Sequence, residues 1–173
     1  MEVYLVRHTE TVCEKGICYG QSDVRILEPY LEIFESIKNQ IPDDVTVYSS
    51  PLIRCTELAN YLSNKIITDN RLLEMNFGDW EMKNWDAIPP DDFTPWMNDF
   101  VNVTVPNGES FVELYNRVND FIENELHNNT SKPVVIVAHA GVIRSILCKM
   151  SNLPLKDAFN NKVDFGSVIK VNL

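Results

Sequence analysis

Apolar residues along this chain follow two patterns, short continuous runs and longer stretches with helical spacing. Short, mostly apolar runs are typical of strands that are buried on both faces of a sheet. They predict strands at residues 3–6, 45–48, 66–68, 134–138 and 167–171. Between them, apolar residues that recur every three or four positions predict helices at about 29–41, 51–62, 111–122 and 141–151. Strands that alternate with helices indicate an α/β fold, a three-layer sandwich with a mostly parallel central sheet and helices on both faces.

Two of the predicted helices have recognisable start signals. Ser110 and Glu113 form a capping box ahead of the helix at 111–122. Ser49-Ser50-Pro51 offers a capping serine and a proline near the first turn of a helix that continues to about Leu62. Both signals support the helix starts that the apolar spacing predicts.

Residues 73–107 show no regular period and contain four prolines and all three tryptophans. We expect a partly helical excursion here, lid-like at about 75–108, that folds over one end of the sheet. Trp80, Trp85 and Trp96 are expected to pack in the core and in this excursion. Because no linker, repeat or low-complexity tract interrupts the chain, we predict a single domain over residues 1–173.

The composition narrows the classes of partner. The formal net charge of −10 disfavours binding to nucleic acids and to anionic membranes, which require a basic face, but it allows a small anion in a local cationic pocket. The chain has no apolar stretch long enough to cross a bilayer and begins without the features of a signal peptide, so we expect a cytoplasmic protein. The four cysteines lack disulfide spacing and are interpreted as reduced thiols: Cys13, Cys18, Cys55 and Cys148.

Two of the three histidines stand where predicted strands end. His8 follows the first strand through Arg7, and His139 directly follows the strand at 134–138. Open α/β sheets bind their ligands at the carboxyl edge, and the adjacent arginine favours an anion, with phosphate as the leading candidate. From these positions alone, two histidines placed by chance is an equally good interpretation. The third histidine, His127, is interpreted as a helix-end residue that faces solvent or the helix dipole.

Other signatures of phosphate chemistry are missing from the sequence. There is no GxxxxGK(S/T) loop, no GxGxxG, no Asp-x-Asp, and no arginine six residues after a cysteine. Without His-x-His or His-x-x-x-His spacing, we expect no metal site, and no cofactor is predicted. A histidine nucleophile remains as the candidate chemistry.

A histidine that attacks phosphorus has three requirements. Its far ring nitrogen must be held as a donor, so that the near nitrogen presents its lone pair. The phosphoryl oxygens need cationic donors, and the leaving oxygen needs an acid. Residues that follow the ends of the predicted strands supply the candidates Arg7, Arg54, Glu74 and His139.

Five stretches of the chain resemble, in order, the motifs of the histidine phosphatase superfamily, which has a phosphoglycerate-mutase-like fold. They are LVRHTET at 5–11, SSPLIRC at 49–55, LEMNFGDWE at 73–81, NGES at 107–110 and VAHAG at 137–141. The resemblance implies that His8 is transiently phosphorylated and that Arg7, Arg54 and His139 bind the phosphoryl group. It also implies that Glu74 protonates the leaving oxygen and later activates water. Backbone N–H groups near Ala140 and Gly141, at a helix start, are weaker candidates for anion contacts.

Two positions depart from the family pattern. Thr9 stands where a glycine is usual, and Glu14 stands where an asparagine is usual. We expect Thr9 to shift its loop slightly, because it brings a Cβ into a place where none is common. Glu14 would repel a phosphate, so we expect it to point away from the site or to contact a cation.

The loop ICYGQSDV at residues 17–24 is similar to a stretch of α-ribazole 5′-phosphate phosphatases, which act in assembling the nucleotide loop of cobalamin. Arg25-Ile26 follows it where Pro-Leu is usual. This resemblance implies a small phosphomonoester, α-ribazole 5′-phosphate, as the substrate. Candidate contacts to the substrate are Tyr19 and Gln21 in the loop, and Thr11 and Ala140 outside it.

The length of the excursion bears on the type of reaction. Relatives that act as mutases carry a longer cover that excludes water from the phosphoenzyme, so the short segment here favours hydrolysis. The alternatives that stay open are a broad-specificity or sugar-phosphate phosphatase, a phosphoglycerate mutase, and a non-catalytic protein that binds a phosphorylated ligand.

Overall fold

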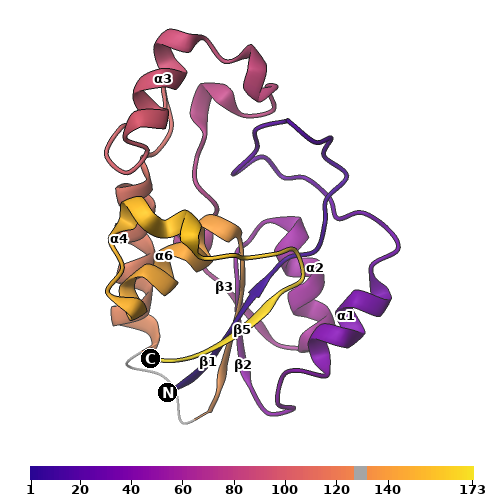
Figure 1. The fold of residues 1–173 in the computed structure, drawn as a ribbon. Coiled ribbons are helices and arrows are strands. Elements are labelled where there is room, and N and C mark those ends of the chain that lie inside the picture. The colour runs from indigo at the N-terminus through magenta and orange to yellow at the C-terminus, as the bar shows by residue number, and fades with distance from the viewer. Residues whose placement is uncertain (127–131) are drawn as a thin grey trace.

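The computed structural model describes residues 1–126 and 132–173, and helices flank a central β-sheet on both sides (Figure 1). The strands are β1 (Glu2–Arg7), β2 (Thr46–Ser49), β3 (Ile66–Thr68), β4 (Val134–Ala138) and β5 (Val168–Asn172). The α-helices are α1 (Leu31–Lys38), α2 (Ile53–Leu62), α3 (Pro90–Asn98), α4 (Phe111–Phe121) and α6 (Ala140–Ser151). A π-helical turn, Ile122–Leu126, continues α4, and 3₁₀ turns lie at Asn70–Leu72, Gly78–Trp80, Trp85–Ala87 and Leu155–Asn160.

The predicted strands and helices are therefore confirmed, with boundaries that differ by one to a few residues. The largest difference is α1, which begins at Leu31 and ends at Lys38, whereas the apolar spacing predicts a helix over 29–41. The prediction for His127 lies outside the described residues.

The strands of the sheet lie in the order β3-β2-β4-β1-β5. Neighbours are parallel except for β5, which pairs antiparallel with β1 at one edge. This arrangement confirms the α/β fold with a mostly parallel sheet. Because Arg7 of β1 is in register with Ala138 of β4, the next residue on each strand is a histidine, and both histidines lie at the same edge.

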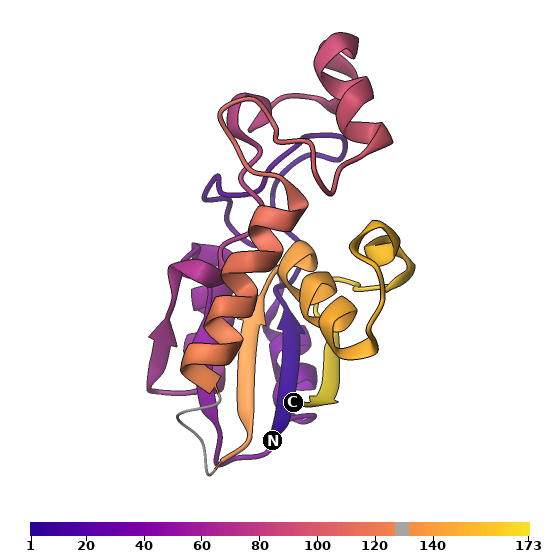
Figure 2. The same cartoon turned by 90° about the vertical axis from the view of Figure 1, so that its left-hand side faces the viewer.

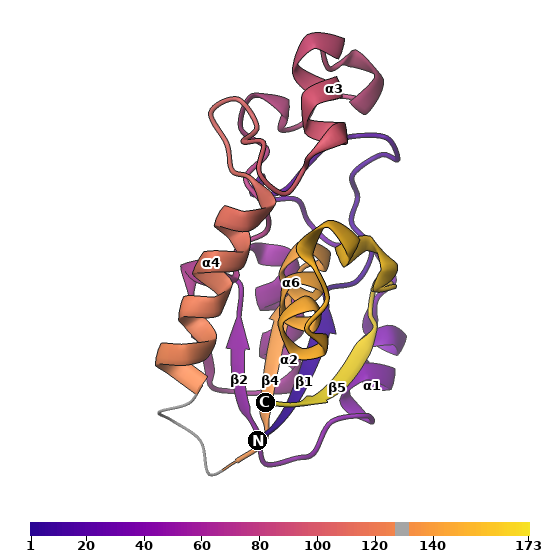
Figure 3. The ribbon, with the colours of Figure 1, turned by 60° about the vertical axis from the view of Figure 1, so that its left-hand side comes forward.

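Alternate residues of the central strands point into two separate cores. Val3 and Leu5 of β1 pack on the side of α4 and α6, whereas Tyr4 and Val6 pack on the side of α1 and α2. Figure 3 shows α4 and α6 in front of the sheet, with α1 and α2 behind it. Burial on both faces explains why these strands read as continuous apolar runs, and it confirms the three layers.

The two start signals have different outcomes. Ser110 accepts from the Glu113 N–H and Glu113 accepts from the Ser110 N–H, so the capping box of α4 is confirmed. The predicted serine cap of α2 is wrong: this helix begins after Leu52 without a side-chain cap, and its Ile53 N–H donates to Asp23 Oδ1 at 2.8 Å. The cap comes from a distant loop, which local sequence cannot reveal.

Residues 75–108 form the expected partly helical segment, which contains α3 and two of the 3₁₀ turns. Figure 2 shows α3 projecting beyond the end of the sheet that lies opposite the two termini. Trp80 and Trp96 are buried, while Trp85 is half-buried. Across the described ranges, no helix combines the length and apolar character that a bilayer crossing requires.

Candidate active site

The carboxyl edge of the sheet gathers side chains from four parallel strands. His8 and His139 follow β1 and β4 directly, Arg54 lies in the first turn of α2 after β2, and Glu74 follows the 3₁₀ turn after β3. Together with Arg7 they line one cavity of about 330 Å³, which we call the histidine cavity. Its other lining residues are Ile17, Tyr19, Trp85, Arg144 and Phe165. The five residues that the sequence singles out for phosphate chemistry therefore meet in one place.

His8 is nearly fully buried, yet its ring lines this cavity. Its Nδ1 lies 2.7 Å from the carbonyl oxygen of Thr9. A carbonyl can only accept, so Nδ1 carries the proton and Nε2 keeps its lone pair. Burial, with the positive charges of Arg54 and Arg7, lowers the pKa of His8 to about 3, although the hydrogen bond to Thr9 raises it. The ring is thus a neutral imidazole with one free nitrogen, as a nucleophile requires.

His139 lies beside His8, with 5.2 Å between the ring centroids. Its Nδ1 accepts a hydrogen bond from Arg54 Nε at 3.3 Å, so its Nε2 is the donor to Ser50 Oγ at 2.8 Å. Burial, together with the neighbouring His8 and Arg54, lowers the pKa of His139 well below its usual value. The Cys55 thiol packs 3.5 Å from Nε2, and all four cysteines are free thiols.

The loop at residues 20–22 fixes the Arg54 guanidinium. The guanidinium donates to the carbonyls of Ser22 at 2.8 Å and Gly20, besides its bond to His139. A guanidinium has five N–H donors, so two remain for an anion in the cavity. Arg54 is 1% exposed, which is rare for an arginine and indicates that the fold holds it in place.

Glu81 organises that loop. Its carboxylate accepts from the backbone N–H groups of Gly20, Gln21 and Ser22, and from the Ser22 hydroxyl at 2.6 Å. Although burial raises the pKa of Glu81, the hydrogen bonds from Ser22, Gly20 and Gln21 bring it below its usual value. The carboxylate therefore stays charged and keeps the loop carbonyls aimed at Arg54.

Arg7 and His8 both contact the ring of Phe165. Arg7 donates to the Val163 carbonyl at 2.7 Å and stacks on Phe165, with 3.7 Å from the guanidinium carbon to the ring centroid. Its Nε is buried and has no hydrogen-bond partner among the described residues. A buried donor without a partner is costly, so Arg7 gains from an anionic ligand.

Glu74 is held by two backbone donors, one on the next residue, Met75, and one on Gly141 at the start of α6. Its Oε1 accepts from the Met75 N–H at 2.9 Å, and its Oε2 accepts from the Gly141 N–H at 3.0 Å. The Gly141 donor that the sequence offers to a ligand anion is therefore occupied by Glu74. The backbone carbonyl of Glu74 also accepts two hydrogen bonds, one from Gln21 Nε2 at 3.0 Å and one from Arg117 at 3.0 Å.

The remaining predicted contacts are spread around the cavity. Tyr19 lines it, and the Tyr19 hydroxyl lies 3.0 Å from Thr11 Oγ1, so Thr11 supports Tyr19 from outside the cavity. The side-chain amide of Gln21 donates a hydrogen bond to the Glu74 backbone carbonyl and does not line the cavity. Ala140 lines a neighbouring pocket rather than the histidine cavity.

The two residues that depart from the family pattern do not line the histidine cavity. Glu14 is exposed and lines a separate cleft with Glu10 and Lys15, away from the histidine cavity. Thr9 is buried, and its hydroxyl has no hydrogen-bond partner among the described residues. Its carbonyl nevertheless serves His8, so the loop keeps the geometry that the nucleophile needs. In the described ranges, no three His, Cys, Asp or Glu side chains gather where a metal ion could be held.

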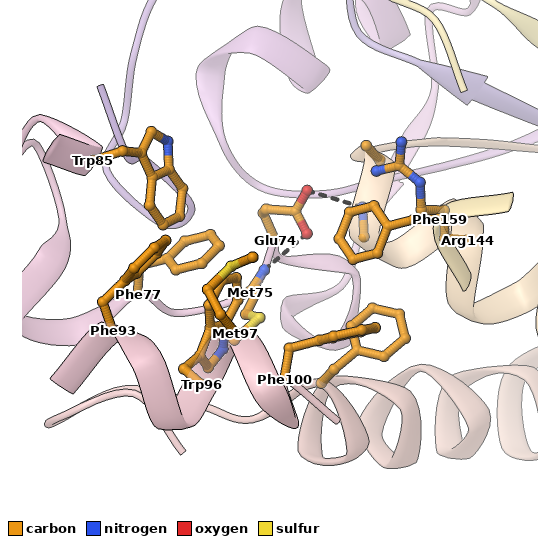
Figure 4. Close-up of a pocket in the computed structure, with 13 residues that line it drawn as sticks. Glu74, Met75, Phe77, Trp85, Phe93, Trp96, Met97, Phe100, Arg144 and Phe159 are labelled. Carbon is orange, nitrogen blue, oxygen red and sulfur yellow. Dashed lines mark hydrogen bonds between the residues drawn. The ribbon is translucent and has the colours of Figure 1, made fainter. Parts of the chain in front are cut away.

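A second pocket of about 330 Å³ adjoins the histidine cavity and shares Glu74, Trp85 and Arg144 with it. Figure 4 shows that most of its wall is aromatic, with side chains from the 75–108 segment facing Phe159 and α6. We call it the aromatic pocket, and it is lined chiefly by Phe77, Trp85, Phe93, Trp96, Phe100 and Phe159, with Met75 and Met97.

Comparison with known families identifies the family of this chain. A model of the histidine phosphatase superfamily (branch 1) matches residues 3–173. The chain belongs to the histidine phosphatase superfamily. It is a phosphatase of that family, which acts on phosphomonoesters.

Several relatives of this histidine phosphatase have names that point to different substrates. It is 29% identical to a Hydrogenobacter thermophilus protein named "Putative phosphoserine phosphatase 2", over 99% of this chain and 89% of the relative. It is 26% identical to the adenosylcobalamin/α-ribazole phosphatase of Escherichia coli, over 99% and 91%. Among solved structures, the α-ribazole phosphatase from Shigella flexneri superposes with a TM-score of 0.89 at 27% identity, covering 100% of this chain and 91% of that one.

The structure adds two functional positions that sequence reasoning did not single out in this histidine phosphatase. Glu81 is the last residue of the third motif, and its place in that stretch is a sequence signal that could have indicated a role at the site. Arg144 lies one turn along α6 from Gly141 and reaches both cavities. An arginine in a helix gives no local sign of such a position, because surface arginines are common there.

Proposed function

We propose that the chain hydrolyses a phosphomonoester through a phosphohistidine on His8. The observation that carries the proposal is the bond from His8 Nδ1 to the Thr9 carbonyl, because it leaves Nε2 with a free lone pair in a cavity lined by arginines. Arg7, Arg54 and Arg144 line the same cavity and provide positive charge for a phosphoryl dianion.

In the first step, His8 Nε2 attacks phosphorus and the bond from phosphorus to the ester oxygen breaks. Arg7 and Arg54 bind the phosphoryl oxygens, His139 donates to one of them when its Nε2–H turns from Ser50 Oγ to the phosphate, and Glu74 donates a proton to the leaving alcohol. Each Glu74 oxygen accepts one backbone hydrogen bond and keeps a second lone pair, where this proton can be carried. In the second step, Glu74 takes a proton from water, the water oxygen bonds to phosphorus, and His8 is released with phosphate.

The substrate that we propose is α-ribazole 5′-phosphate, which would place the enzyme in the assembly of the cobalamin nucleotide loop. The similarity of residues 17–24 to α-ribazole phosphatases supports it, and Tyr19 of that stretch lines the histidine cavity. The names of the Escherichia coli and Shigella flexneri proteins agree with it. A phosphoserine phosphatase is the second candidate, favoured by the Hydrogenobacter thermophilus relative.

We also propose that residues 75–108 act as a small lid within a single domain. Their side chains form much of the wall of the aromatic pocket beside the histidine cavity. A cover of this size shields a substrate without sealing the phosphohistidine from water, which favours hydrolysis over mutase transfer.

Two measurements test the proposal. Brief reaction with a radiolabelled ester should label the protein with an acid-labile phosphate, and His8→Ala should abolish both labelling and turnover while inorganic phosphate still binds. Near-full activity of His8→Ala would exclude His8 as the nucleophile. A panel of α-ribazole 5′-phosphate, phosphoserine, 3-phosphoglycerate and sugar phosphates tests the substrate. Equal values of kcat/KM across this panel would reject α-ribazole 5′-phosphate and leave the reaction class intact.

A further inference from the structure

The aromatic pocket has no part in the phosphoryl chemistry derived above. It nevertheless meets the histidine cavity at Glu74, Trp85 and Arg144, which line both spaces. Glu74 is the proposed acid for the leaving alcohol, so the group attached to that alcohol lies at the entrance of the aromatic pocket. The neighbouring cleft mixes the charged groups of Glu10, Glu14 and Lys15 with apolar side chains. Among the described residues, the only charged ones that line the aromatic pocket are Glu74 and Arg144.

We propose that the aromatic pocket is the subsite for a planar aromatic base carried by the leaving group, and that Arg144 binds the polar group that links the base to the phosphate. This inference rests on the proposed function, because it takes the phosphoryl group to lie beside His8. It deepens that function by selecting a nucleoside phosphate over an amino-acid phosphate.

The size and shape of the pocket fit a bicyclic ring. An apolar cavity of about 150 Å³ accommodates benzene, and the aromatic pocket has about 330 Å³. Trp85 and Trp96 both line the pocket and stack on each other, with 22° between their planes and 6.0 Å between ring centroids. Phe100 and Phe159 meet edge to face at 5.1 Å on the other side. Flat faces and edges of this kind pack well against another aromatic ring.

The rim of the pocket exposes large apolar side chains. Met97 is 56% exposed and Phe159 is 59% exposed, and both line the pocket. Figure 4 shows Met97 and Phe159 on opposite sides of the group of side chains that line the pocket. A ligand ring seated between them would remove this apolar surface from water, which supplies affinity without any movement of the buried core.

Arg144 is held at the junction of the two spaces. Its Nε donates to the Asn161 carbonyl at 3.2 Å, and its guanidinium carbon lies 4.9 Å from the Phe159 ring centroid. Arg144 and Glu74 line the same two cavities; burial lowers the pKa of Arg144, while the Glu74 carboxylate raises it. The remaining N–H donors suit the hydroxyl groups of a sugar between base and phosphate.

The same wall disfavours a small zwitterion. Phosphoserine carries an ammonium and a carboxylate next to its ester oxygen, and an aromatic wall cannot replace the water around them. The Glu74 carboxylate already accepts from Met75 and Gly141. Beyond Glu74 and Arg144, the described residues that line the pocket are uncharged, so the pocket favours an aromatic base over the charged groups of phosphoserine.

Two esters that differ only in the base provide the test. α-Ribazole 5′-phosphate and ribose 5-phosphate share the sugar and the phosphate, so the ratio of their kcat/KM values reports the base alone. We expect a ratio of roughly 30 or more, in the range that a well-filled apolar subsite provides. Phe159→Ala and Met97→Ala should lower this ratio about tenfold, mainly through a higher KM for α-ribazole 5′-phosphate. Leu31→Ala, at an apolar side chain that is 62% exposed on α1, is the matched control.

A binding measurement separates this inference from the proposed function. Dephosphorylated α-ribazole should quench the fluorescence of the tryptophans in the pocket, whether or not the protein hydrolyses any ester, and Phe159→Ala should weaken its binding. Equal kcat/KM for the two esters, or quenching that Phe159→Ala leaves unchanged, would overturn the inference. A dimer that dissociates on Phe159→Ala would also overturn it, because a second copy would then cover the pocket. Absence of a phosphohistidine would overturn only the proposed function.

Discussion

The backbone N–H of Gly141 donates to Glu74 Oε2 at 3.0 Å, and a Cβ on Gly141 would lie 2.3 Å from Oε1 of the same carboxylate. The glycine thus holds the proposed acid and leaves room for it. An alanine in a helix is ordinarily more stable than a glycine by about 0.5–1 kcal/mol. Any loss of function in Gly141→Ala therefore reports the displacement of Glu74 and not a weaker helix.

We predict that Gly141→Ala lowers kcat/KM, which reports the phosphorylation of His8, at least tenfold for alkyl phosphates, because general acid catalysis contributes roughly 10²–10⁴-fold. Hydrolysis of 4-nitrophenyl phosphate, whose leaving group needs no proton, should fall far less. Ser145→Ala removes only a local hydroxyl bond to Val142 on the same helix and is the control. Equal losses for both esters would mean that Gly141 does not act through Glu74.

Glu81 gives a prediction about phosphate binding. In Glu81→Gln, an amide –NH₂ replaces an oxygen that accepts from the Gly20, Gln21 and Ser22 loop, so donor faces donor and the loop moves. Arg54 depends on the carbonyls of Gly20 and Ser22, and a displacement of about 1 Å can cost 10²-fold in rate. We expect kcat/KM to fall 10- to 100-fold, with weaker binding of inorganic phosphate.

The matched control for this variant is Glu113→Gln. Glu113 also accepts a backbone N–H, at the start of α4 and outside both cavities. It should lower stability and leave kcat/KM unchanged. If both variants change activity equally, Glu81 has no special relation to Arg54.

The buried His8 predicts how stability depends on pH. Its pKa is about 3 in the folded chain and 6.5 in the unfolded chain, so between these values the unfolded state binds more protons. The free energy of unfolding therefore falls as pH falls below 6.5, by about 2 kcal/mol per buried histidine between pH 6.5 and 5. Urea unfolding of the wild type and His8→Asn at a series of pH values measures this. The variant should show the shallower slope, and identical slopes would contradict the low pKa of His8.

The same pKa keeps the nucleophile neutral in mild acid. Protonation of His8 should not reduce kcat/KM until the pH approaches 3, because the His8 ring of the free enzyme takes up a proton only near that pH. A rate profile with an acid limb near 6.5 that His139 substitution leaves in place would contradict this.

The capping box of α4 gives a prediction about stability alone. Ser110→Ala removes the acceptor for the Glu113 N–H and should cost about 1 kcal/mol in the free energy of unfolding. Ser110→Thr keeps the hydroxyl and should retain most of that free energy. Both should hydrolyse the substrate normally, and a loss of activity in Ser110→Ala at full stability would mean that the start of α4 also serves the site.

The sequence predicts those parts of the molecule that depend on local pattern. Runs of apolar residues locate β1 and β4, and the identical position of His8 and His139 after them follows from parallel register. The capping box of α4 is likewise a short-range signal. These features need no knowledge of distant residues, which is why they are confirmed.

Features made by distant residues could not be predicted in this way. Asp23 replaces the expected serine at the start of α2, and Gly141 holds Glu74 across 67 residues. The aromatic pocket is built from a segment without period, facing residues 140–159. The sequence predicts that its tryptophans are packing residues, and only the fold shows that Trp85 lines both cavities.

In the described sheet, β1 pairs with β4 and β5, two strands that follow it in the sequence only after β2, β3 and helices α1 to α4. A nascent chain on the ribosome therefore carries His8 for most of its synthesis without the strand that positions His139. Long-range pairing of this kind closes late in folding. Until β4 is present and paired with β1, His8 has no His139 beside it, so we expect no phosphate release from a nascent chain that stops before β4.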